Sequence, residues 1–218
     1  MSIFFNYNKT YLVLFFLFIY SFSHATEKLE NYRILIIGDS LIQGYGLPKD
    51  KGFVNQLQKK ILEKKDNILL INGGVSGDTT AGGLSRIDWS ITDDINAVAI
   101  SLGANDMLRG IPPSFSKDNL SKIIMKIKEN NLPILLIGIK SIENYGTEYK
   151  NEFDSMFYNL ADEFELLLYP DLMAPIINKE KDLSLYLQED MRHPNEKGVE
   201  IIVQEILPTI NNFIDSFN

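Results

Sequence analysis

Runs of consecutive hydrophobic residues recur along the chain, separated by longer stretches in which hydrophobic residues return every three or four positions. Short runs rich in isoleucine, leucine and valine are typical of strands that are buried on both faces. The sequence predicts four such strands, at residues 33–37, 68–71, 97–102 and 134–139, and a weaker fifth at residues 166–169.

The stretches between and after these runs carry hydrophobic residues at helical spacing. This period predicts amphipathic helices that bury one face against a sheet. Pro208 falls inside the last of them, where its missing N–H is expected to kink or split the helix. The predicted helical stretches are residues 53–61, 120–127, 149–164 and 199–213.

The regular alternation of strands and helices decides the expected fold class. Continuous hydrophobic strands joined by helices predict a mostly parallel sheet with helices on both faces and right-handed crossovers. We find no repeat, low-complexity tract or linker that divides the chain. The sequence therefore predicts a single α/β domain, a three-layer α/β/α sandwich, over residues 26–218.

The first 25 residues differ from the rest. Lys9 is their only charged residue, residues 11–22 are apolar except for Ser21, and Ser23-His24-Ala25 places small residues where a signal peptidase reads. We expect a secretory signal peptide at residues 1–25, cleaved after Ala25, and an exported protein, in bacteria a periplasmic one, with no membrane span left after cleavage. The alternative is an uncleaved leader that tethers the protein to the membrane.

Composition excludes several classes of function. The 218 residues carry a net charge of −8, so a broad cationic face for nucleic acid is not expected. Cysteine is absent, which removes disulfides, thiolate nucleophiles and cysteine-ligated metals. Only His24 and His193 are histidines, so a catalytic zinc site is not expected and no metal or cofactor is predicted.

Polar residues gather where the predicted strands end. Ser40 follows the first strand, and the only histidine after the leader, His193, lies in the last loop with Asp190 three residues before it. A serine hydroxyl becomes nucleophilic when a histidine accepts its proton and a carboxylate fixes that histidine. The carboxyl ends of parallel strands share one edge of the sheet, so these three residues are candidates for a catalytic triad.

An oxyanion hole is also available at this edge. Gly77 can offer an unobstructed backbone N–H, Asn105 a side-chain amide, and Ser40 its own N–H. Each of these signals also has an ordinary interpretation, since serine and asparagine cap helices and glycines shape loops. Together, and in this order along the chain, they favour a serine hydrolase.

The four motifs resemble those of the SGNH, or GDSL-type, hydrolase family. They are Gly-Asp-Ser-Leu around Ser40, Ser-Gly-Asp-Thr around Gly77, Gly-x-Asn-Asp around Asn105, and Asp-x-x-His ending at His193. Within that family the chain is most similar to the small periplasmic thioesterase I group, also described as arylesterases and lysophospholipases. The closer similarity rests on Ser-Gly-Asp-Thr-Thr at 76–80, Leu-Arg-Gly at 108–110, and Asn-Tyr-Gly at 144–146 with Tyr149.

The resemblance implies a flavodoxin-like fold, a monomer, and the roles suggested above: Ser40, Asp190 and His193 as the triad, with Ser40, Gly77 and Asn105 as oxyanion donors. Two departures stand out. Ala104 replaces a second glycine before the asparagine, and Met191-Arg192 replace the usual Gly-Ile between the aspartate and the histidine.

The expected function is hydrolysis of a carboxylic ester or thioester through an acyl-enzyme. The substrate implied is a small acyl ester or thioester, with lysophospholipid among the candidates. Two alternatives stay open: a carbohydrate O-acetylesterase of the same family, and a non-catalytic exported binding module. The residues expected to form an apolar acyl-binding wall are Leu108, Ile111, Ile142 and Tyr145.

Overall fold

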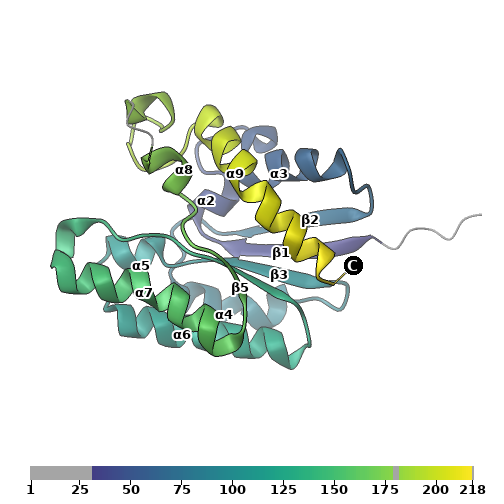
Figure 1. Ribbon diagram of the computed structural model, residues 1–218, viewed down its shortest axis with the longest axis horizontal. Coiled ribbons are helices and arrows are strands. Elements are labelled where there is room, and N and C mark those ends of the chain that lie inside the picture. The colour runs from purple at the N-terminus through teal and green to yellow at the C-terminus, as the bar shows by residue number, and fades with distance from the viewer. Residues whose placement is uncertain (1–30, 179–181, 218) are drawn as a thin grey trace, which may run out of the picture. The chain divides into compact units, whose positions relative to one another are not determined.

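The computed structural model describes residues 31–178 and 182–217, and residues Tyr32–Asn218 form one unit (Figure 1). The predicted leader, residues 1–25, lies outside the described residues. All five predicted strands are present, with boundaries that differ from the prediction by up to three residues. They are β1 (Tyr32–Gly38), β2 (Ile68–Gly74), β3 (Ala97–Ser101), β4 (Ile134–Ile137) and β5 (Leu167–Tyr169).

The strands form one parallel sheet in the order β2-β1-β3-β4-β5. Its first strand therefore lies between the second and the third, with Gly38 aligned to Gly74 on one side and to Ser101 on the other. The chain crosses from one face of the sheet to the other after β2. Ligands of open parallel sheets bind outside the carboxyl ends of the strands at such a switch point.

Helices cover both faces of the sheet, which confirms the predicted three-layer α/β/α sandwich (Figure 1). One layer contains α2 (Ser40–Gln43), α3 (Phe53–Leu62), α8 (Ala174–Ile177) and α9 (Glu196–Asp215). The other contains α4 (Thr80–Ser90), α5 (Ala104–Leu108), α6 (Pro113–Glu129) and α7 (Gly146–Phe164). Three short 3₁₀ turns are η1 (Lys49–Lys51), η2 (Glu143–Tyr145) and η3 (Leu183–Leu185).

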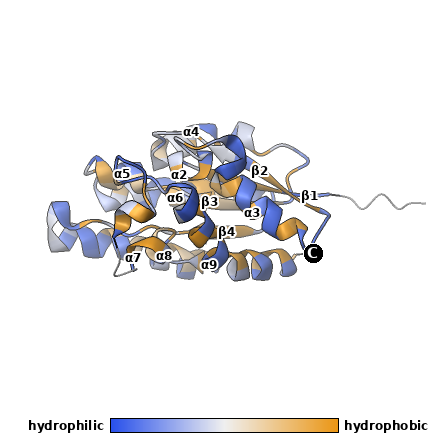
Figure 2. Cartoon of the chain, turned by 90° about the horizontal axis from the view of Figure 1, so that it is seen from above, coloured by the Kyte–Doolittle hydropathy of each residue, from blue (hydrophilic) through white to orange (hydrophobic). Residues whose placement is uncertain are grey.

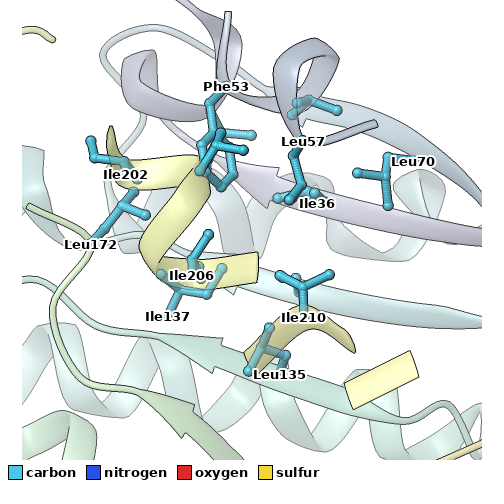
Figure 3. Close-up of a cluster of buried hydrophobic side chains, with 14 of the residues drawn as sticks. Ile36, Phe53, Leu57, Leu70, Leu135, Ile137, Leu172, Ile202, Ile206 and Ile210 are labelled. Carbon is cyan, nitrogen blue, oxygen red and sulfur yellow. The ribbon is translucent and has the colours of Figure 1, made fainter. Parts of the chain in front are cut away.

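Two hydrophobic clusters hold the layers together, one on each face of the sheet. In the first, Ile206 of α9 faces Ile137 of β4, and Leu57 of α3 lies over Ile36 of β1 (Figure 3). Strand β3 is buried along its whole length, and in Figure 2 it is coloured as hydrophobic between the two helical layers. Each fully buried aliphatic or phenyl side chain contributes about 1.5–3 kcal/mol.

Pro208 does not split the last helix, because α9 runs unbroken from Glu196 to Asp215 with the proline inside it. Pro208 lies on the exposed side of the helix, where the carbonyl group that lacks its usual N–H partner is accessible to water. Ile206 and Ile210, on the buried side, fix both halves to the core.

Helix α4 was not predicted at all. Its sequence contains Gly82 and Gly83, and Ile87 is its one fully buried large hydrophobic residue, so it has no clear apolar stripe. It forms because Thr79 caps its first turn by accepting from the N–H of Gly82, and because the helix packs against α6. Within the described residues, no helix has the length and apolarity needed to cross a membrane.

Candidate active site

Ser40 lies at the first turn of α2, immediately after β1. Asp39 caps this helix by accepting a hydrogen bond from the N–H of Leu41 at 3.0 Å. Gly38 permits the sharp turn, because a Cβ there would lie 2.2 Å from Ile42 Cγ1 and 2.8 Å from the carbonyl oxygen of Ser101. The local sequence thus places the serine hydroxyl at the carboxyl end of the central strands.

The three predicted triad residues meet in the structure. Ser40 Oγ lies 2.8 Å from His193 Nε2, although the two residues are 153 positions apart. His193 Nδ1 lies 2.5 Å from Asp190 Oδ2. The other oxygen, Asp190 Oδ1, accepts from the backbone N–H groups of Arg192 and His193, each at 3.0 Å. The carboxylate therefore fixes both the imidazole ring and the loop that carries it.

Two aspartates beside Ser40 have opposite electrostatic environments. The hydrogen bond from His193 lowers the pKa of Asp190 to about 2, so this carboxylate is ionised at neutral pH. Burial raises the pKa of Asp39 to about 6, because removing its side chain from water outweighs the hydrogen bond from Leu41 and the charge of His193, which lower it. An ionised Asp190 stabilises a protonated imidazole, which is what proton transfer from Ser40 requires.

The three predicted oxyanion donors follow β1, β2 and β3. Gly77 has a φ of 83°, in the left-handed region that favours glycine. Asn105 Nδ2 donates to the main-chain oxygen of Asp78 at 2.9 Å, which orients the amide and leaves its second N–H available. Among the described residues, the N–H groups of Ser40 and Gly77 have no hydrogen-bond partner.

Asp106, the neighbour of Asn105, has a structural function that the sequence did not reveal. Its carboxylate is 1% exposed and accepts from Thr80 N at 2.8 Å, Thr80 Oγ1 at 2.5 Å and Ser116 Oγ at 3.0 Å. These bonds join α5 to the starts of α4 and α6. A buried carboxylate with three donors fixes the loop that carries Asn105.

A cleft of about 920 Å³ opens over the triad. Leu108, Ile142 and Tyr145 line it as predicted, but Ile111 does not. Instead the carbonyl oxygen of Ile111 accepts a hydrogen bond from the Tyr149 hydroxyl at 2.9 Å, in a loop outside the lining. Hydrophobic lining residues that the prediction did not include are Leu41, Tyr45, Met107, Ile139, Met173, Ile177, Leu187 and Met191.

The unusual Met191-Arg192 pair lies at the wall of this cleft. Met191 has a φ of 54° and is 50% exposed. The two other non-glycine residues with positive φ, Asn131 and Glu165, lie at helix ends, where this conformation is common. Met191 therefore carries backbone strain two residues before His193.

Tyr45 and Arg86 are further residues of the site that the sequence analysis missed. The ring of Tyr45 lies 4.7 Å from that of His193, centroid to centroid. Arg86 comes from α4, the unpredicted helix, and bonds to the loops beside Ser40 and Gly77. The signal for Arg86 was that it is the only cationic residue between Thr80 and Ser90. Among the described residues, no group of three or more potential metal ligands exists.

Comparisons with known proteins identify the family of this chain. Residues 36–201 match the GDSL-like Lipase/Acylhydrolase family. An arylesterase from Vibrio mimicus is 36% identical over 90% of this chain and 96% of its own length. Thioesterase 1/protease 1/lysophospholipase L1 from Escherichia coli K12 is 30% identical, over 95% of this chain and 98% of its own.

A solved structure resembles the fold closely. The psychrotrophic esterase EstA from Pseudoalteromonas sp., in a structure inhibited by monoethylphosphonate, has a TM-score of 0.79 and 34% identity, covering 85% of this chain and all of that one. The match to the family spans far more than half of the sequence and includes every predicted site residue. The chain therefore belongs to the GDSL-like lipase/acylhydrolase family and is a carboxylic ester or thioester hydrolase.

Proposed function

We propose that Ser40, His193 and Asp190 are the catalytic triad with which this protein cleaves acyl esters and thioesters. The observation that carries the proposal is the continuous chain of contacts from Ser40 Oγ to His193 Nε2 at 2.8 Å and from His193 Nδ1 to Asp190 Oδ2 at 2.5 Å. The 2.8 Å contact lies within the range of hydrogen bonds that support proton transfer, and the 2.5 Å contact is shorter than an ordinary N–H···O bond.

In the first half of the reaction, His193 Nε2 accepts the proton of Ser40 Oγ as that oxygen attacks the acyl carbonyl carbon. The oxyanion that forms accepts hydrogen bonds from the N–H groups of Ser40 and Gly77 and from Asn105 Nδ2. The protonated His193 then gives its proton to the leaving oxygen or sulfur as the carbon–leaving-group bond breaks. The product of this half is an acyl-serine.

In the second half, His193 accepts a proton from water as the water oxygen attacks the acyl-serine carbonyl. The second tetrahedral intermediate collapses when the bond to Ser40 Oγ breaks and His193 returns the proton to that oxygen. The carboxylic acid leaves, and the enzyme is restored. Asp190 stays ionised throughout, which agrees with its pKa of about 2.

The hydrophobic lining of the cleft favours substrates whose acyl group is longer than acetyl. Leu108, Ile142 and Tyr145 are each between 42% and 46% exposed and line the cleft together with Met191. Such exposed hydrophobic side chains gain contacts when an acyl chain covers them. We therefore favour an arylesterase or thioesterase activity over a carbohydrate O-acetylesterase.

The triad is tested with a fluorophosphonate probe, which reacts covalently with an activated serine. We expect the purified protein to be labelled and to hydrolyse p-nitrophenyl esters, and Ser40→Ala to lose both properties while keeping its circular dichroism spectrum. Labelling or hydrolysis retained in Ser40→Ala would refute the assignment. An unlabelled and inactive wild-type protein would support the binding-module alternative instead.

A series of p-nitrophenyl esters from acetyl to palmitoyl tests the acyl preference. We expect kcat/KM to rise beyond the acetyl ester as the chain covers the apolar wall, by up to about 0.8 kcal/mol per buried methylene. A sharp fall after acetyl would contradict this expectation and support the O-acetylesterase.

We also propose that the protein is exported, that its signal peptide is cleaved after Ala25, and that the remaining domain is a monomer. The proposal is supported by the apolar run at residues 11–22 and the small residues before the cleavage point. The intact mass of the exported protein tests cleavage. A mass that still includes residues 1–25 would support the tethered alternative. Light scattering tests the monomer.

A further inference from the structure

Arg86 of α4 is a buried cation that none of the catalytic steps uses. Its side chain is 9% exposed, whereas an arginine is rarely buried unless its charge is paired. Its Nε donates to Asp78 Oδ2 at 2.7 Å, and its Nη2 donates to the main-chain oxygen of Gly38 at 3.0 Å. Removing a guanidinium from water costs several kcal/mol. The burial of Arg86 at this position therefore requires an explanation.

Both acceptors of Arg86 lie next to catalytic groups. Gly38 is the last residue of β1 and precedes Ser40 by two residues, and Asp78 directly follows Gly77 in the loop after β2. The main-chain oxygen of Asp78 also accepts the bond from Asn105 Nδ2 at 2.9 Å. One guanidinium therefore connects the end of β1 with the loop after β2 and, through Asp78, with the amide that follows β3.

Holding α4 in place does not require this arrangement. Ile87 is fully buried next to Arg86, and Thr80 at the start of α4 is bonded to Asp106 through two atoms. These contacts fix the helix to the core without a buried charge. What arginine adds is a rigid planar group that bonds two acceptors at a fixed separation, which a lysine cannot reproduce.

We infer that Arg86 is a positioning residue for the oxyanion hole: it holds Asp78, and through Asp78 the Asn105 amide, in register with the turn that carries Ser40. The inference rests on the proposed catalytic functions of Ser40 and Asn105. Stabilisation of an oxyanion depends on donors that are held in place before the reaction, and a displacement of about 1 Å costs on the order of 100-fold in rate.

Arg86→Lys is the first test, because it keeps the positive charge but removes the two-point geometry. We expect kcat for a p-nitrophenyl ester to fall about 10- to 100-fold with KM changed by less than about twofold, since the lost contact acts in the transition state. If Arg86→Lys keeps the kcat of the wild type, the charge alone suffices and the inference is wrong.

The second test makes Arg86→Lys in the Asn105→Ala variant as well as in the wild type. The comparison separates an effect on the position of the Asn105 amide from an effect on the stability of the fold. If Arg86 acts through Asn105, Arg86→Lys must cost less in Asn105→Ala than in the wild type, because the amide it positions is already gone. A loss of equal size in both backgrounds would overturn the inference.

A double variant keeps the inference testable even where a single change at Arg86 unfolds the protein. Arg86→Met with Asp78→Asn leaves no unpaired buried charge and keeps the main-chain oxygen that holds Asn105. We expect a folded protein whose kcat stays low and whose KM is nearly unchanged. A kcat equal to that of the wild type would overturn the inference.

Asp88→Asn is the matched control on the same helix. Asp88 is exposed and pairs with Lys126 of α6 at 2.7 Å, so its loss weakens the anchoring of α4 far from the cleft. We expect kcat to be unchanged, and a fall like that of Arg86→Lys would overturn the inference. Ser40→Ala distinguishes failure of the proposed function from failure of this inference. If the proposed function is wrong, Ser40→Ala is active; if only this inference is wrong, Ser40→Ala is inactive.

Discussion

The two sides of the catalytic cleft are held by different kinds of contact. On the nucleophile side, the polar groups behind Ser40 and Asn105 are buried, with Asp39 2% and Asp106 1% exposed. Asp106 accepts from Thr80 and Ser116 at the starts of two other helices, whereas Asp39 accepts from Leu41 in its own turn. On the base side, the Asp190 side chain is 39% exposed. Bonds within residues 190–193 shape that loop.

The base side still has one firm attachment. Gln188 Nε2 donates to the main-chain oxygens of Tyr45 and Pro194 at 2.8 and 2.9 Å, which joins the histidine loop to the chain just after α2. Changes on the nucleophile side are therefore expected to affect both fold and chemistry, whereas changes on the base side are expected to affect mainly the chemistry.

The largest effect is expected on the base side, from Asp190→Asn. The asparagine oxygen can keep the bonds to the backbone of the loop, but its NH₂ group would face His193 Nδ1 and favour the tautomer whose Nε2 carries a proton. That nitrogen cannot accept the proton of Ser40, so we expect kcat to fall about 10⁴-fold. Thermal unfolding should change little, and a large loss of stability would contradict the proposed independence of the base side from the fold.

Asn105→Ala is the corresponding change on the nucleophile side. We expect kcat to fall about 100- to 1000-fold with a small change in KM, because an oxyanion donor acts in the transition state. Steady-state kinetics on one aryl ester measure this. Asn130→Ala, an exposed asparagine that ends α6, is the control and should leave kcat unchanged. A loss confined to KM would mean that Asn105 only binds the substrate.

Asp39→Asn tests how burial on the nucleophile side affects stability. The pKa of Asp39 rises from 3.8 to about 6 on folding, so between these values the folded state binds more protons than the unfolded state. This group therefore makes the free energy of unfolding decrease as pH rises from about 4 to 6, by up to about 3 kcal/mol. Asparagine is also a good helix cap, so the variant should fold normally.

Urea unfolding at several pH values between 4 and 7 measures this contribution. We expect the pH-dependent decrease to be smaller in Asp39→Asn than in the wild type, and the variant to be the more stable of the two above pH 6. Parallel pH profiles for the two proteins would show that Asp39 does not titrate in this range.

The smallest effect is expected from Met191→Gly on the base side. Glycine tolerates the φ of 54° that strains methionine, so we expect the free energy of unfolding to rise by about 1 kcal/mol or less. Glu165→Gly, at a φ of 55° at the end of α7, is the control far from the cleft. A stability gain accompanied by slower hydrolysis of long-chain esters would mean that the exposed Met191 side chain binds the acyl group.

Much of the site was readable from the sequence, because its residues lie in short motifs directly after hydrophobic strands. Ser40, Gly77 and Asn105 could be assigned to one edge of the sheet, since parallel strands bring their carboxyl ends together. Asp190 was predictable from its spacing to the only histidine after the leader. Ile111 was assigned to the cleft wall because its segment follows the third strand and is hydrophobic, but in the structure Ile111 is not among the lining residues and its carbonyl oxygen accepts from Tyr149.

The sequence alone determined the alternation of strands and helices, because hydrophobic period is a local property that each segment carries by itself. It also left His193 as the only histidine after residue 25, and therefore as the only histidine candidate for the proposed base in that part of the chain. The tertiary structure decided the contacts of Arg86 with Asp78 and Gly38, the burial of Asp106 and the positive φ of Met191. These depend on how segments far apart in the chain pack and bond, and no local pattern records the partner that a buried polar group will find.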